Sequence, residues 1–223
     1  GLADDLRLDV WLYGYILPVE KRFVNPEFCY LGTLLAAAEQ IRSGVTCFAD
    51  MYYFEEDVAW AAAQAGMRAI CGETLMKFPS PDADSYDDSL AYCREFLEHF
   101  RDHELIVAAP APHSVYMTTP ELLAEVVRMA QEFDVPVVTH VSETKLEVTE
   151  WLKAYNMPPV VWMEEQGVLE AKVVAAHCVH VNDLDIDILA KRGVGVANNP
   201  TSNLKLASGI APVAQMLAAG VNV

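Results

Sequence analysis

A histidine and a glutamate three residues apart, His140 and Glu143, follow an apolar segment at residues 135–139. That segment is short and rich in β-branched residues, which is typical of a buried strand. Parallel α/β sheets place their functional groups at the carboxyl ends of such strands. An imidazole can bind a metal ion there while a nearby carboxylate moves protons, so the pair indicates metal-assisted hydrolysis. A histidine that merely completes its hydrogen bonds at a strand end is the alternative explanation.

Polar side chains also follow the other strand-like segments. The strand-like segments are residues 45–49, 68–71, 105–109, 135–139, 172–176 and 193–197, and the polar residues near their ends are Asp50, Glu73, His113, His140, His177 and Asn199. His177 follows the next strand after His140, so it could approach the same water molecule. The competing interpretation is that these groups only solvate the ends of the strands.

Helix-like segments alternate with these strands, in units of roughly 20–35 residues, which predicts a parallel sheet with crossover helices. Helices are expected at residues 34–43, 55–65, 86–101, 120–133, 145–155, a shorter stretch to 166, 183–191 and 210–218, with a loop at 200–209. A (β/α)₈ TIM-type barrel is favoured over an open sheet, because a barrel gathers the strand ends into one site and because phosphate-loop motifs are absent from the sequence. With fewer than eight units, the barrel is expected to be incomplete.

The composition of the 223 residues narrows the class of protein. The formal net charge of −17 disfavours nucleic acid and anionic membranes as partners. An apolar run long enough to span a bilayer and a signal peptide are both absent from the sequence. The five cysteines are odd in number and form no C-x-x-C pair, which indicates reduced packing residues in a cytoplasmic protein. We expect one domain over residues 1–223, with residues 1–32 as a lead-in segment.

Several motifs in this chain resemble the amidohydrolase superfamily. They are PHS at 112–114, THVSE at 139–143, AAHCVH at 175–180, NPTSNLKL at 199–206 and SGIAP at 208–212. The chain resembles in particular the 5′-methylthioadenosine/S-adenosylhomocysteine deaminase group, over nearly its whole length. It is similar, less closely, to triazine hydrolases and guanine deaminases of the same branch.

The resemblance implies a role for five residues. His140 matches a zinc ligand, and Glu143 matches the carboxylate that holds the purine ring and passes a proton to it. His177 matches the histidine that orients the attacking hydroxide. Glu20, in the lead-in segment, matches a carboxylate that binds ribose hydroxyls, and His113 matches a substrate-binding histidine. The implied reaction is hydrolytic deamination of a 6-aminopurine nucleoside with one divalent metal, zinc, as cofactor.

The chain also departs from the family pattern. The H-x-H pair of the first strand and the aspartate that ends the last strand have no counterpart in these residues, so the other zinc ligands are expected outside this chain. The small β-sandwich of the family is not expected here either. An acidic stretch between Glu73 and Asp88, with Lys77 as its cation, disfavours a carboxylate-bearing substrate. Methylthioadenosine or adenosine is therefore favoured over S-adenosylhomocysteine.

Two alternatives stay open at this point. Within the same superfamily, the protein could be an s-triazine or guanine-type hydrolase, which would not need Glu20 to bind a ribose. From a different class, the chain could be a non-catalytic ligand-binding scaffold or an inactive fragment. The exposed sides of an incomplete barrel would also favour a homo-oligomer.

Overall fold

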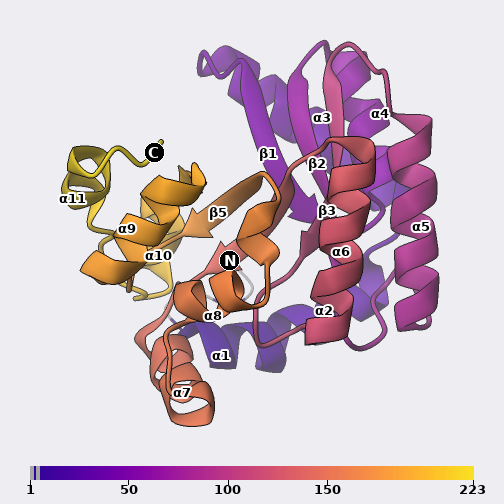
Figure 1. Ribbon diagram of the computed structural model, residues 1–223. Coiled ribbons are helices and arrows are strands. Elements are labelled where there is room, and N and C mark those ends of the chain that lie inside the picture. Colours follow the sequence, from indigo (N-terminus) through magenta and orange to yellow (C-terminus); the bar gives the residue numbers. More distant parts are fainter. Residues whose placement is uncertain (1–2, 4–5) are drawn as a thin grey trace.

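Parallel strands follow one another in chain order through the centre of the molecule (Figure 1). The computed structural model describes residue 3 and residues 6–223, so residues 1, 2, 4 and 5 of the expected lead-in segment lie outside the described residues. One sheet contains β1 (Cys47–Tyr52), β2 (Arg68–Leu75) and β3 (Ile106–Pro112), and the other contains β4 (Val137–Val141), β5 (Val173–His177) and β6 (Gly195–Ala197).

The two sheets meet between β3 and β4. A parallel bridge pairs Ser114 with His140, and the His140 amide donates to the His113 carbonyl over 3.1 Å. Beyond β6, a further parallel bridge pairs Gly195 with Asn222. All strand pairs are parallel, and each strand pairs with the next one in the chain. The carboxyl ends of β3, β4 and β5 therefore lie next to one another.

Helices connect successive strands, and α4, α5 and α6 cover one side of the first sheet (Figure 1). The helices, in chain order, are α1 (Leu8–Trp11), η1 (Leu12–Ile16, π-helical), α2 (Leu17–Phe23), α3 (Pro26–Arg42), α4 (Glu55–Ala65), α5 (Tyr86–His99), α6 (Pro120–Phe133), α7 (Lys145–Tyr155), α8 (Pro159–Glu165), η2 (Val168–Glu170, 3₁₀), α9 (Asp183–Arg192), α10 (Pro200–Lys205) and α11 (Val213–Ala218). Within the described ranges, no helix is both long and apolar enough to cross a membrane.

Local capping signals explain where several helices begin. Side chains of Ser85, Thr119 and Thr144 each accept a backbone N–H in the first turn of α5, α6 and α7. Asn182 and Asp185 form a reciprocal capping box at the start of α9. The predicted helices at 55–65, 120–133 and 145–155 are confirmed residue for residue.

Two predictions about helices were wrong. The helix expected to begin at residue 34 begins at Pro26, where the side chain of Asn25 accepts from the Phe28 amide. Asparagine followed by proline is a strong helix start, since proline is favoured in the first turn. The loop expected at 200–209 begins with α10, where Pro200 again occupies the first turn.

The inner surface of the strands is lined by small residues. Ala109, Ala111 and Val138 form a separate buried cluster there, distinct from the larger core between the strands and the helices. Gly72 is the tightest position, because a Cβ atom on it would lie 2.8 Å from the Asp50 carbonyl oxygen and 2.9 Å from the Ala111 Cβ. The strand backbones therefore approach each other closely at this level.

Candidate active site

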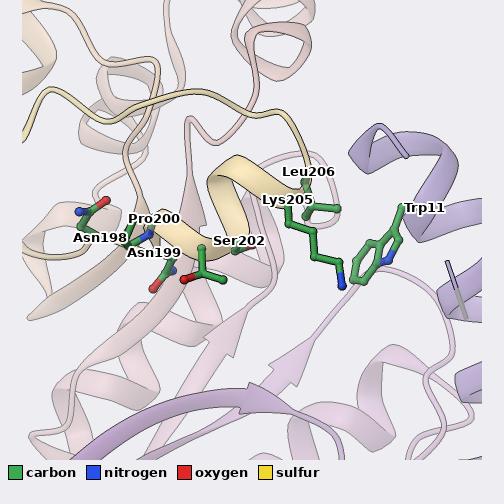
Figure 2. A pocket seen from close by; sticks show the side chains of 8 residues that line it. Trp11, Asn198, Asn199, Pro200, Ser202, Lys205 and Leu206 are labelled. Carbon is green, nitrogen blue, oxygen red and sulfur yellow. The ribbon is translucent and has the colours of Figure 1, made fainter. Parts of the chain in front are cut away.

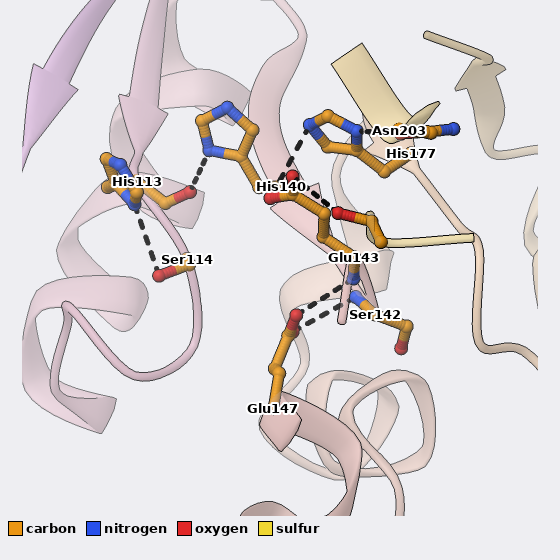
Figure 3. A network of polar contacts seen from close by, with 9 residues as sticks. His113, Ser114, His140, Ser142, Glu143, Glu147, His177 and Asn203 are labelled. Atoms are coloured by element: carbon orange, nitrogen blue, oxygen red, sulfur yellow. Dashed lines mark hydrogen bonds and ion pairs between the residues drawn. The ribbon is translucent and has the colours of Figure 1, made fainter. Parts of the chain in front are cut away.

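Three imidazole rings stand side by side where β3, β4 and β5 end (Figure 3). The ring centroids of His113 and His140 are 4.7 Å apart, and those of His140 and His177 are 5.4 Å apart and stacked. The sequence placed these residues at three successive strand ends, and the parallel register of β4 and β5 brings them together.

His140 presents one nitrogen for binding. Its Nδ1 lies 2.7 Å from the His113 carbonyl oxygen, to which it donates, so Nε2 carries the free lone pair. Burial, and then the neighbouring His177, lowers the pKa of His140 to about 4. Burial likewise lowers the pKa of His113 well below its ordinary value, with the two neighbouring imidazoles acting in the same direction. Both rings are therefore neutral at physiological pH, which is the form that binds a metal ion.

Glu143 and His177 form a buried pair beside His140. The Nδ1–H of His177 donates to Oδ1 of Asn203 over 2.7 Å, and its Nε2 lies 3.7 Å from Oε2 of Glu143. The Ser208 hydroxyl donates to Oε1 of Glu143 over 3.4 Å. Burial raises the pKa of Glu143 above its ordinary value, although His177 and Ser208 act in the opposite direction. A glutamate in this setting can hold a proton and release it again.

A strained turn orients Glu143 toward His177. Ser142, which precedes it, has a φ of 48°, in the left-handed region that most residues avoid. The carboxylate of Glu147 accepts the amides of Ser142 and Glu143 over 3.0 and 2.8 Å and so holds the turn (Figure 3). Burial raises the pKa of Glu147 to about 7.

Glu20 belongs to a second group, at the end of β1. It lies on α2, and the Tyr52 hydroxyl donates to its Oε1 over 3.0 Å. Burial raises the pKa of Glu20, while hydrogen bonds from Tyr52 and Tyr53 act against that shift. Glu20 thus holds an ordered carboxylate oxygen at the strand ends, rather than a solvated surface position.

Two cavities adjoin these strand ends. One, of about 630 Å³, lies between α1 and α7 and is lined by Tyr13, Glu147, Trp151 and Ser208 among others. The second, of about 550 Å³, lies between Trp11 and α10, with Asn199 and Lys205 in its lining (Figure 2). Ser208 in the first cavity is the residue that contacts Glu143, so this cavity opens next to the buried pair.

Not every polar strand end joins the imidazole cluster. Glu73 is fully buried, and its Oε2 accepts from the Glu55 amide over 3.2 Å. Sequence reasoning also missed three residues that contact the cluster, namely Glu147, Asn203 and Ser208. Glu147 stands one helical turn after Glu143, and the other two lie within motifs already recognised, at 199–206 and 208–212.

One described histidine is oriented as metal-binding histidines are. The neutral Nε2 of His140, fixed by the Nδ1 contact to a carbonyl, is the arrangement usual for a metal-binding histidine. In residue 3 and residues 6–223, no group of three or more His, Cys, Asp or Glu side chains is arranged to hold a metal ion. Among the described residues, His140 therefore has the geometry that would fit one metal ligand.

The chain matches one family model and many related proteins. The model, described as the amidohydrolase family, matches residues 2–223. The 5-methylthioadenosine/S-adenosylhomocysteine deaminase of Thermodesulfovibrio yellowstonii is 45% identical over 223 residues, which are 100% of this chain and 51% of that protein. The 5′-deoxyadenosine deaminase of Methanothermobacter thermautotrophicus is 43% identical over 225 residues, covering 100% of this chain and 52% of that protein. The chain thus spans about half the length of the curated relatives it matches.

Solved structures share the fold. An adenosine deaminase from Xanthomonas campestris with bound zinc superposes with a TM-score of 0.94 at 37% identity, covering 99% of this chain and 50% of that one. A guanine deaminase from C. acetobutylicum, with guanine bound, has a TM-score of 0.89 at 23% identity and covers 98% of this chain and 55% of that one. The second likeness is one of fold alone.

Proposed function

This chain belongs to the amidohydrolase family, and from that premise we propose that the protein containing it deaminates a 6-aminopurine nucleoside by hydrolysis. The observation that carries the proposal is the buried pair of Glu143 and His177, 3.7 Å apart, beside the imidazole of His140. Relatives over the whole chain are named as deaminases of methylthioadenosine, S-adenosylhomocysteine or 5′-deoxyadenosine, which supports the same reaction.

Each residue of the cluster has a proposed role. His140 would hold a divalent metal, proposed to be zinc, through Nε2. Such an ion, when bound, lowers the pKa of a coordinated water and makes it a nucleophile at neutral pH. His177 would orient the attacking water through Nε2, because its Nδ1 is already committed to Asn203. Glu143 would carry a proton to the purine ring as the water adds to C6 and ammonia leaves.

Substrate recognition is assigned to two further residues. We propose that Glu20 accepts the ribose hydroxyls and that His113 contacts the purine. Lys77 lies in the loop between β2 and α5, and its Nζ donates to the Tyr116 carbonyl over 2.8 Å. The loop also contains Asp82, whose carboxylate accepts from the Phe54 amide and the Ser80 hydroxyl. Because the lysine of this acidic stretch is engaged by a backbone carbonyl, we favour methylthioadenosine or adenosine over the carboxylate-bearing S-adenosylhomocysteine.

The wider architecture is proposed on the same basis. We propose that the six strands are a sector of a (β/α)₈ barrel and that residues 1–223 belong to one barrel domain, in which residues 1–32 carry Glu20 to the strand ends. The exposed side chains of Phe28, Leu31 and Leu35 lie three and four residues apart on α3 and would suit contact with further protein, including a homo-oligomer. All five cysteines are free thiols, which accords with a cytoplasmic location.

Ammonia release by the full-length gene product tests this proposal. The metal-loaded protein should convert methylthioadenosine and adenosine to their 6-oxo products, with one ammonia per turnover. Glu143→Gln should reduce kcat by about 10²-fold or more, because it removes the proton carrier. Glu165→Gln, an exposed change on α8, serves as the matched control.

Other outcomes would replace the proposal. Activity on guanine or an s-triazine, with none on nucleosides, would favour the hydrolase alternatives within the family. Nucleoside binding that raises the melting temperature, without ammonia release from metal-loaded protein, would identify a non-catalytic scaffold.

A further inference from the structure

A short segment after β6 contacts both members of the buried pair. Asn203, on α10, accepts the Nδ1–H of His177, and Ser208, five residues later, donates to Glu143. Only 2% of Asn203 and 6% of Ser208 is exposed to solvent, so water does not compete for either contact. Residues 203–208, here termed the α10 tether, thus connect two groups that lie 34 residues apart in the chain, at the ends of separate strands.

The tether is internally fixed. The Ser208 amide donates to the Asn203 carbonyl over 2.8 Å, and the Ala207 amide donates to the Leu204 carbonyl over 3.2 Å. Ala207 has a φ of 54°, which is the left-handed turn that ends many helices. These bonds set the distance between the two contact points of the tether.

A second histidine anchors the tether from outside. The Nε2–H of His180 donates to the Ser208 carbonyl over 2.7 Å. Gly209 follows with a φ of 129°, and a Cβ atom there would lie 3.0 Å from Val179 Cγ1. The end of the tether is therefore packed against the segment that follows β5. His177 is the last residue of that strand.

The chemistry of Asn203 selects one form of His177. The oxygen of its side-chain amide can only accept, so Nδ1 of His177 must carry the hydrogen, and the lone pair of Nε2 is directed toward Glu143. A hydroxyl in place of the amide would allow either tautomer. Ser208 acts in the complementary way, because its hydroxyl donates to one oxygen of Glu143 and leaves the other facing His177.

We propose that Asn203 and Ser208 are positioning residues of the deamination reaction, which hold His177 and Glu143 in the tautomer and separation that proton transfer needs. This inference rests on the proposed function. Neither residue is given a chemical step of its own, and both act through the residues they contact. Positioning groups of this kind change rates by 10–100-fold in comparable sites.

Four variants of the full-length gene product test the tether. Asn203→Leu removes the acceptor, Asn203→Asp keeps an acceptor oxygen, Ser208→Ala removes the donor, and Leu217→Ala changes an exposed side chain on α11, outside the tether. We expect kcat to fall about 10- to 100-fold in N203L and about 10-fold in S208A, with KM changed less than about threefold. N203D should recover most of the loss of N203L, and L217A should match the wild type. Unchanged kcat in folded N203L, or failure of N203D to recover activity, would overturn the role of Asn203.

A readout independent of turnover separates this inference from the proposed function. Nitrogen NMR of histidine-labelled protein should show His177 protonated at Nδ1 in the wild type and in N203D, and a mixture of tautomers in N203L. If the wild type releases no ammonia, the proposed function fails, yet a fixed Nδ1–H tautomer lost in N203L would still support the tether. If N203L does not fold, S208A decides: a lower kcat at unchanged KM supports the tether, and unchanged kcat overturns it.

Discussion

Replacing Glu20 by alanine should remove the preference of the protein for substrates with ribose hydroxyls. Glu20 carries an ordered carboxylate, with one oxygen bound to the Tyr52 hydroxyl over 3.0 Å. A carboxylate offers about four lone-pair sites, so the tyrosine leaves room for the two neighbouring hydroxyls of a ribose. Without Glu20, those hydroxyls lose a charged acceptor, whereas a substrate that lacks them loses nothing.

The size of the effect follows from the hydrogen bonds involved. A hydrogen bond to a charged group contributes about 1.5–3 kcal/mol, so two contribute about 3–6 kcal/mol. Because about 1.4 kcal/mol corresponds to a tenfold change, kcat/KM for a ribonucleoside should fall roughly 10²- to 10⁴-fold. Tyr52 already takes part of the acceptor capacity of Glu20, which places the expected loss at the lower end, about 10²-fold.

The assay is a cycle of two proteins and two substrates. Values of kcat/KM are measured for adenosine and 2′,3′-dideoxyadenosine with wild type and Glu20→Ala under identical conditions. The wild type should prefer adenosine, and the variant should treat the two substrates alike. Glu27→Ala, an exposed change on α3, is the control. An equal loss on both substrates, or an undiminished preference for adenosine in the variant, would refute the assignment.

Three further predictions concern stability and the metal. Burial raises the pKa of Glu55 well above its ordinary value, so the folded protein keeps this proton at pH values where the unfolded chain releases it. The free energy of unfolding should therefore fall as the pH rises above the pKa of the unfolded chain, by up to about 1.4 kcal/mol per pH unit. Glu55→Gln should flatten that decline in melting temperature against pH, whereas the exposed Glu95→Gln should not; parallel curves for wild type and Glu55→Gln would contradict it. Leu122→Ala, at a fully buried position of α6, should cost about 2–5 kcal/mol in urea unfolding, and Leu184→Ala, which is 57% exposed, less than about 0.5 kcal/mol; equal midpoints for the two would be inconsistent with the packing. Chelation of the full-length protein should abolish ammonia release and zinc should restore it, but His140→Ala should not regain metal or activity.

The strand-end residues were predictable because a simple rule places them. In a parallel sheet, polar residues at the ends of successive strands lie along one edge. This rule predicted that His113, His140 and His177 lie close together, as they do in the structure. Five of the six strands end later than expected; β1, for example, ends at Tyr52 rather than Ala49. Pairing with the neighbouring strand extends it, and pairing partners are not visible in a local pattern.

The contacts that support the site could not be predicted in the same way. The Asn203 side chain reaches His177 across 26 residues, through a helix that was expected to be a loop. The left-handed φ of Ser142 and its stabilisation by Glu147 also depend on tertiary packing. Local sequence indicates which residues lie at a strand end, but the orientation of each side chain is decided by partners that are distant in the chain.

The close approach at Gly72 limits how this protein can vary. A methyl group at this position would meet the Ala111 side chain and the Asp50 backbone, and backbone cannot move aside as a flexible side chain can. We therefore expect position 72 to stay glycine, because a smaller residue at position 111 would leave the contact with the Asp50 backbone in place. The cavities next to the strand ends lie on the other side, against α1, α7 and α10, so a larger ligand would be accommodated by changing these helices and not the strands at Gly72.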